Sequence, residues 1–392
     1  MTRPKRWAFE VGAVVIAAAI VAMLLMQLST ARGLVLGDGQ PLFGDFIGFW
    51  SAGRAALDGH AEQVHDRALI FTYHQLAAPG VRFMAWWNAP PTFLLIVTPL
   101  ALMPFPAAAI AFLIGSVAVY FIAARKLLPD SRALVFAATL PAAAFHLGTV
   151  QTGLLIAGVS GLALHWLDRR PLAAGALVSA LAIKPHLALL WPLLLALSGR
   201  WRAFAAATTG TLAFIALAAL VLGLDSFVRF FENLSASQSV VSEQLLSTPA
   251  YASFYANLID AGAPQTLAAL VHGASAAAAL AVSLWLFRRA DREIAGAALC
   301  AATLLLSPYL FFYDFTLLAV GAALLGAPRD RFELIAIVAA WSAGLSLAIG
   351  FYAPVPLCPL AAWLILLAAA RRARGAAYPT QRTQAPPRSA QS

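Results

Sequence analysis

Charged residues are scarce in this chain. Only 11% of its 392 residues are Asp, Glu, Lys or Arg, whereas 61% are hydrophobic. A soluble globular domain typically has about 25% charged residues, and a surface with much less charge is poorly hydrated. The composition therefore excludes a water-soluble globule and indicates an integral membrane protein.

Cysteine and metal-binding motifs are also nearly absent. The two cysteines, Cys300 and Cys358, fall inside or beside apolar runs, which excludes a disulfide framework or a cysteine zinc site. The other possible ligands lie in one loop at spacings that match no metal motif: His60, His65, His74 and Asp66. No glycine-rich phosphate loop follows a strand pattern. We predict neither a bound metal nor a cofactor.

The net charge of +9 does not indicate a nucleic-acid partner. Nucleic-acid binding uses a continuous basic face, whereas the basic residues here form short clusters between apolar runs. Such clusters are typical of the cytoplasmic loops of membrane proteins. They therefore report the topology of the chain.

Long apolar runs recur from residue 7 to residue 371. A helix of about 20 apolar residues crosses a hydrocarbon core of ~30 Å. We predict an all-α polytopic membrane protein with about twelve transmembrane helices, some of them short or broken. The predicted spans are 7–28, 106–124, 133–147, 152–167, 171–183, 186–198, 202–222, 264–287, 293–307, 309–326, 332–350 and 355–371, with a half-length or re-entrant helix at 92–103.

The first run could be a cleaved signal peptide or a retained helix. Its length and the poor cleavage site after it favour retention. The predicted transmembrane domain covers residues 1–371, and residues 372–392 are expected to form a disordered cytoplasmic tail. Two longer polar segments, 29–90 and 223–263, are expected to be loops with interfacial helices.

The positive-inside rule orients this layout. With both termini in the cytoplasm, most of the 26 Lys and Arg residues fall on the cytoplasmic side, and the two long loops face outward. This balance requires two short helices that meet at Lys184-Pro185, because one continuous span would place Arg200 and Arg202 outside. Pro185 supplies a local cause for the break, since it disfavours the α conformation at Lys184.

The same layout brings polar residues from distant parts of the chain to the outer face. They are Asp45, Asn88, His146, Gln151, Lys184, His186, Tyr309, Tyr313 and Asp314. An ionisable residue at membrane depth is costly and therefore indicates function with a partner nearby. Lys184 and Asp314 are the clearest cases.

Asp45 begins a predicted amphipathic helix along the bilayer surface, with apolar residues at helical spacing: Phe46, Phe49, Trp50, Gly53 and Leu57. Its carboxylate is either an N-cap of that helix or a general base for an acceptor hydroxyl. Lys184 likewise has two interpretations. It either snorkels or pairs with Asp314, or it binds a lipid phosphate beside His186.

The order of several short motifs resembles glycosyltransferase family 87, which transfers sugars from polyprenyl phosphates. The motifs are Asp45-Phe46 with Phe49-Trp50 and Ala52-Gly53; Asn88-Ala89-Pro90-Pro91 through Pro99-Leu100-Ala101; Gln151-Thr152-Gly153; Ala182-Ile183-Lys184-Pro185 with Arg200-Trp201-Arg202; and Ser307-Pro308 with Tyr313-Asp314. The resemblance implies a multi-spanning transferase with its catalytic Asp, here Asp45, in the first outer loop. It also implies a donor that is commonly polyprenyl-phosphate mannose.

These observations predict an inverting hexosyltransferase in the cytoplasmic membrane, with its active site on the outer face. It would move a hexose, mannose by resemblance, from a polyprenyl phosphate to a glycan or glycolipid acceptor. Asp45 is the predicted base, Lys184 and His186 the donor-phosphate ligands, and the predicted substrate-binding residues are Asn88, Gln151, Tyr313 and Asp314. Two alternatives remain at this point: a lipid or sugar-lipid transporter or flippase, and an inactive relative that serves as a scaffold.

Overall fold

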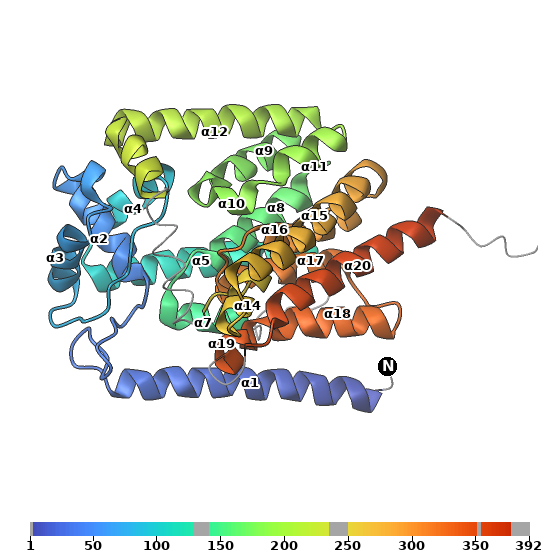
Figure 1. The fold of residues 1–392 in the computed structure, drawn as a ribbon, viewed down its shortest axis with the longest axis horizontal. Helices are drawn as coiled ribbons and strands as arrows, with labels where there is room; N and C mark the ends of the chain where they lie inside the picture. Colours follow the sequence, from blue (N-terminus) through green and yellow to red (C-terminus); the bar gives the residue numbers. More distant parts are fainter. Residues whose placement is uncertain (1–2, 129–140, 235–249, 351–353, 378–392) are drawn as a thin grey trace, which may run out of the picture.

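The computed structural model describes residues 3–128, 141–234, 250–350 and 354–377. Within these ranges every regular element is a helix, and extended pairing is limited to isolated β-bridges. The predicted all-α class is therefore confirmed. Figure 1 shows α1 and α12 along opposite edges of the molecule, with α2, α3 and α4 grouped at one end.

The helices follow the predicted apolar runs closely. In the first half they are α1 (Arg3–Ser29), α2 (Phe46–Leu57), η1 (Ala61–Gln63), α3 (Arg67–Ala77), α4 (Pro91–Leu100), α5 (Phe105–Leu127), α7 (Pro141–Thr149), α8 (Gly153–Trp166), α9 (Pro171–Ala180), η2 (Leu181–Ile183), α10 (Pro185–Ala188) and α11 (Trp191–Leu197). In the second half they are α12 (Trp201–Leu222), α14 (Phe254–Asp260), α15 (Gln265–Arg289), α16 (Arg292–Leu306), η3 (Phe312–Thr316), α17 (Leu317–Leu325), α18 (Arg331–Ser342), η4 (Ala343–Leu345), α19 (Ser346–Gly350) and α20 (Leu357–Ala377).

Three of the described helices are long and apolar enough to cross a bilayer: α5, α12 and α15. Six further apolar stretches in the described helices have 10–17 residues, and prolines begin three of them. Membrane character is thus supported, whereas the count of twelve crossings stays a prediction. Part of the predicted span 133–147 lies outside the described residues. The tail predicted at 372–392 starts too early, because α20 continues to Ala377 and Arg372 on it is buried; residues 378–392 lie outside the described part of the chain.

The chain breaks at Lys184, as predicted. Lys184 has φ −144° and ψ 73°, so η2 ends before it and α10 begins at Pro185. The chain then returns to the end of the molecule from which α9 starts. A hydrogen bond shows this return: Arg200 Nε, after α11, donates to Asp168 Oδ1, before α9, at 2.9 Å. Residues 171–199 therefore form a helical hairpin with Lys184 at its turn.

Further ion pairs tie together the loops that carry predicted cytoplasmic basic residues. Arg292 Nε lies 3.8 Å from Asp168 Oδ2, beside the Arg200 contact. On α20, Arg372 donates to Glu333 at 2.6 Å, and both side chains are buried. Removing one partner of such a pair strongly destabilises the folded protein, because it leaves the other charge buried and unpaired. These contacts agree with the predicted grouping of basic residues at one end, although the orientation of that end in the membrane stays a prediction.

Helix α2 is a buried element of the protein rather than a helix that lies with its apolar face on the bilayer. Phe46 is fully buried and Trp50 nearly so, and the Trp50 indole donates to the Met103 carbonyl at 2.9 Å. Gly53 is required by close packing, since a Cβ there would lie 2.6 Å from the Val97 carbonyl oxygen of α4. The predicted helix is present. The prediction that its apolar face lies on the bilayer surface is wrong, because that face packs inside the protein.

The second polar segment contains another helix. Residues 225–234 are helical, and Phe231 and Leu234 are exposed on it. Such exposed apolar residues suit an interfacial helix, as predicted from the sequence. Residues 235–249 lie outside the described part of the chain.

Candidate functional site

Asp45 stands immediately before α2, yet its side chain does not cap that helix. Its Oδ2 instead accepts a hydrogen bond from Gln151 Nε2 at 2.8 Å. The loop before it lies directly on the end of α7, because a Cβ on Gly44 would come within 2.7 Å of the Gly148 carbonyl oxygen. The structure therefore contains no N-cap interaction of the Asp45 carboxylate with α2.

Gln151 is presented by a strained turn between α7 and α8. Val150 has φ +47°, the only positive φ of a non-glycine residue in the described part of the chain, and its side chain is fully buried. A β-branched residue in the left-handed region costs on the order of 1–3 kcal/mol and persists only where the surroundings impose it. The strain lies directly before the residue that holds Asp45.

Lys184 forms an ion pair with Asp314. The Asp314 side chain is completely buried, whereas that of Lys184 keeps 16% of its surface exposed. Asp314 Oδ2 also accepts from the Phe311 backbone N–H at 3.3 Å, and Lys184 Nζ lies 5.0 Å from the centre of the Tyr313 ring. The pairing alternative for Lys184 is thus present. An ammonium group has three donors, so one contact with Asp314 leaves capacity for an anion.

A cluster of aromatic rings lies beside this ion pair. The rings of Phe311 and Tyr313 are stacked, with centroids 5.1 Å apart, and Tyr251 lies 4.4 Å from Phe311. A short bridge fixes the arrangement, since Ala252 N donates to the Leu310 carbonyl at 2.8 Å. Tyr251 was not among the predicted site residues. Its partners lie about 60 residues later, so no local pattern indicates the contact.

The Asp45–Gln151 pair interacts electrostatically with Lys184 and with Tyr251. Burial raises the pKa of the Asp45 carboxyl group, while the Gln151 hydrogen bond and the positive charge of Lys184 partly oppose that rise. Burial also raises the pKa of Tyr251 to about 12, with the charges of Tyr309 and Asp45 adding to the effect. Gln151 thus contacts Asp45 directly, while Lys184 and Tyr251 interact with it through their charges.

The other predicted residues occupy different positions. His146 is buried, and both ring nitrogens are engaged: Nδ1 lies 2.6 Å from the Ala142 carbonyl, and Nε2 accepts from the Leu154 N–H at 3.2 Å. His186 is within electrostatic reach of Lys184 and Asp314. Asn88 lies elsewhere, in a pocket where its Oδ1 accepts from Asn233 Nδ2 at 3.2 Å.

The loop histidines have separate roles. His74 is buried between the Ser51 hydroxyl, 2.8 Å from Nδ1, and the Ala85 backbone, and burial lowers its pKa to about 4. His65 Nδ1 hydrogen-bonds the Trp87 carbonyl at 3.0 Å, and Asp66 caps α3. Among the described residues, no group of three or more His, Cys, Asp or Glu side chains could hold a metal ion.

Comparison with protein-family models matches residues 87–308 to glycosyltransferase family 87. The chain belongs to glycosyltransferase family 87. The family resemblance of the short motifs is therefore confirmed, and it implies glycosyltransferase activity. No curated protein and no solved structure matches the chain. Within this family 87 glycosyltransferase, the matched region contains Gln151 and Lys184, while Asp45 and Asp314 lie outside it and are joined to it by the contacts above.

Proposed function

We propose that this family 87 glycosyltransferase moves a hexose, mannose by sequence resemblance, from a polyprenyl phosphate to an acceptor hydroxyl on the outer face of the cytoplasmic membrane. One observation carries the proposal. The Asp45 carboxylate is free of the helix it precedes, is held by Gln151, and lies within electrostatic reach of Lys184. A base and a cation are the two groups that such a transfer needs.

Asp45 is the proposed general base. It takes the proton of the acceptor hydroxyl while that oxygen bonds to the anomeric carbon of the donor sugar. The bond between the anomeric carbon and the phosphate oxygen breaks, and its electron pair leaves with the polyprenyl phosphate. A single displacement of this kind inverts the anomeric centre. The raised pKa of Asp45 suits the role, because a base works best when its pKa lies near the operating pH.

Lys184 is the proposed ligand of the donor phosphate, with His186 beside it. A phosphate is a good leaving group when the charge that develops on it is neutralised. The buried Asp314 carboxylate and the Tyr313 ring hold the Lys184 side chain in place, so the ammonium is positioned before the donor binds. One base therefore suffices, without the acid and base carboxylate pair of glycoside hydrolysis.

Replacing Gln151 with Met is expected to move the acidic limb of the pH–rate profile to higher pH. The Gln151 hydrogen bond favours the ionised form of Asp45 and lowers its pKa, so its loss raises that pKa further. A base must be deprotonated, and the variant therefore loses rate mainly at acidic pH and recovers as the pH rises. Initial rates of transfer across a pH series measure this shift.

The matched control is Gln63→Met, since Gln63 is exposed and its side-chain amide donates to the neighbouring Glu62. Its profile should overlay that of the unchanged enzyme. An acidic limb that does not move in the Gln151 variant would contradict the proposed support of Asp45.

Reconstitution tests the donor class. The purified protein in proteoliposomes, given polyprenyl-phosphate mannose labelled in the sugar and membrane glycolipids as acceptors, is expected to yield a labelled glycolipid of inverted anomeric configuration. One polyprenyl phosphate should be released per sugar transferred, and a nucleotide sugar supplied instead should give no product. Movement of intact donor across the bilayer without consumption would favour a transporter and overturn the proposal.

A further inference from the structure

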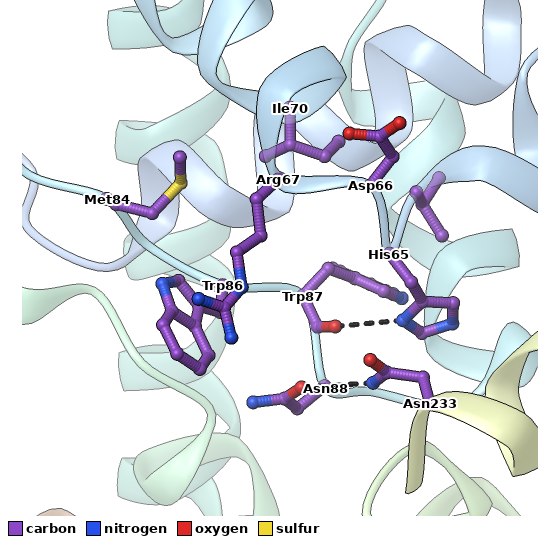
Figure 2. A pocket seen from close by; sticks show the side chains of 10 residues that line it. His65, Asp66, Arg67, Ile70, Met84, Trp86, Trp87, Asn88 and Asn233 are labelled. Carbon is purple, nitrogen blue, oxygen red and sulfur yellow. Dashed lines mark hydrogen bonds between the residues drawn. The ribbon is translucent and has the colours of Figure 1, made fainter. Parts of the chain in front are cut away.

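A pocket lined by both polar and apolar side chains lies between the polar segments 29–90 and 223–263 (Figure 2). Its cavity volume is about 90 Å³, and its mouth is open to the surroundings. Its walls come from the start of α3, from residues 84–88, and from Asn233 on the helical segment 225–234. This volume is below the roughly 300–1,000 Å³ of sites that enclose drug-sized ligands, so the pocket holds only part of a small ring and the rest of the ligand lies in the open mouth.

The pocket offers neutral hydrogen-bonding groups of both kinds. Asn233 Nδ2 donates to Asn88 Oδ1; among the described residues, the Nδ2 donors of Asn88 and the Oδ1 acceptor of Asn233 then remain for a ligand. His65 is bonded through Nδ1 to the Trp87 carbonyl, and burial lowers its pKa. Its ring is therefore neutral near pH 7, and Nε2 is an acceptor.

An aromatic ring and a guanidinium group complete the wall. The Arg67 guanidinium carbon lies 3.5 Å from the centre of the Trp86 ring, and Figure 2 shows the two side chains in contact. Stacking fixes the planar guanidinium while its N–H donors stay available. In the described part of the chain Arg67 forms no ion pair with a carboxylate, and the Asp66 carboxylate is already engaged by the first N–H groups of α3.

Packed aromatic rings join the pocket to α2, the helix that follows Asp45. The Trp87 ring stacks on Phe93 with centroids 5.6 Å apart, and it meets the edge of Phe49 on α2 at 6.2 Å. Phe49 in turn lies 5.9 Å from Phe46, the residue next to Asp45. One aromatic cluster therefore supports both the pocket and the candidate base.

We propose that this pocket binds a sugar ring of the acceptor. A sugar presents hydroxyl groups that both donate and accept, and it needs neutral donors and acceptors placed together beside an apolar face. The pocket supplies that set in Asn88, Asn233, His65, Arg67 and Trp86. An anionic lipid headgroup would instead select several cations, and Arg67 is the only permanent cation lining the described pocket. The role of the pocket in catalysis rests on the proposed transferase function; its affinity for sugars does not.

Saturation-transfer-difference NMR on the full chain in nanodiscs tests the proposal, with methyl α-mannoside, methyl α-glucoside and myo-inositol as probes and glycerol phosphate as the anionic comparison. At least one neutral probe should bind in preference to glycerol phosphate. Asn233→Ala should weaken that binding about 3- to 10-fold, the value of one neutral hydrogen bond. Trp86→Ala should weaken it further. Arg229→Ala is the matched control, since Arg229 lies on the same helical segment but pairs with Glu232.

Kinetics separate the pocket from the reaction. In Asn233→Ala the KM for the acceptor should rise by the same factor, while kcat and the KM for the donor change less than about twofold. Sugar binding that depends on the pocket, in a protein that transfers nothing, would overturn the transferase proposal and leave the pocket assigned. Normal transfer with an unchanged acceptor KM, no binding of any neutral probe, or preferred binding of glycerol phosphate would each overturn the pocket proposal.

Discussion

Asp45→Asn is expected to lower kcat for sugar transfer by about 10²- to 10⁴-fold, the usual contribution of a general base. The amide cannot take the proton of the acceptor hydroxyl. It has nearly the same shape as the carboxylate, and its oxygen can still accept the hydrogen bond from Gln151. The thermal unfolding temperature should therefore change little. Initial rates in proteoliposomes and unfolding curves of the same preparation measure both quantities.

Asp58→Asn is the matched control, because Asp58 lies at the opposite end of α2. It is partly exposed and bonds Arg54 at 3.1 Å and the Tyr73 hydroxyl at 3.1 Å. Its replacement should leave kcat within about twofold, as exposed ion pairs contribute little. Full activity of Asp45→Asn would exclude Asp45 as the base. A loss of activity that follows a loss of folded protein would show a structural role instead.

Lys184→Met is expected to impair both folding and transfer. It leaves the fully buried Asp314 carboxylate without its cation, which typically costs about 3–5 kcal/mol of stability. It also removes the proposed ligand of the leaving phosphate, and loss of one such group lowers kcat by about 10²- to 10³-fold. Unfolding in detergent and initial rates measure the two effects.

The double variant Lys184→Met with Asp314→Asn separates them. It removes the unpaired charge, and the Asn side chain can still accept from the Phe311 N–H. Stability should recover most of the loss while transfer stays low. Transfer that recovers together with stability would show that Lys184 only neutralises Asp314, and the phosphate site would then have to lie elsewhere.

The sequence was sufficient for features with local causes. Apolar runs and prolines gave the positions of most helices, and Pro185 indicated the break at Lys184. The burial of α2 was not predictable in the same way. The period of Phe46, Phe49 and Trp50 indicates a covered face, but lipid and protein cover apolar side chains equally well, so the pattern does not identify the neighbour.

The candidate site was only partly predictable because it is built from long-range contacts. The motifs singled out Asp45, Gln151 and Lys184, yet the bond between Asp45 and Gln151 spans 106 residues and no spacing rule shows it. Tyr251 and Asn233 come from the polar segment 223–263, whose composition indicated only an interfacial helix. The left-handed backbone at Val150 has no sequence signal either, since valine is among the residues least expected there.

The hairpin around Lys184 sets how deep the proposed chemistry lies. From Pro171 to Ile183 the chain has ten α-helical and three 3-10 residues, a rise of about 21 Å, which is less than the ~30 Å hydrocarbon core. Under the proposed function, with Pro171 at one membrane interface, the donor phosphate would have to leave the headgroup plane of the other interface to reach Lys184. Lengthening one arm by a residue would displace the cation by about 1.5 Å along the helix axis. In the proposed mechanism, the length of each arm would therefore set the depth that the donor phosphate has to reach.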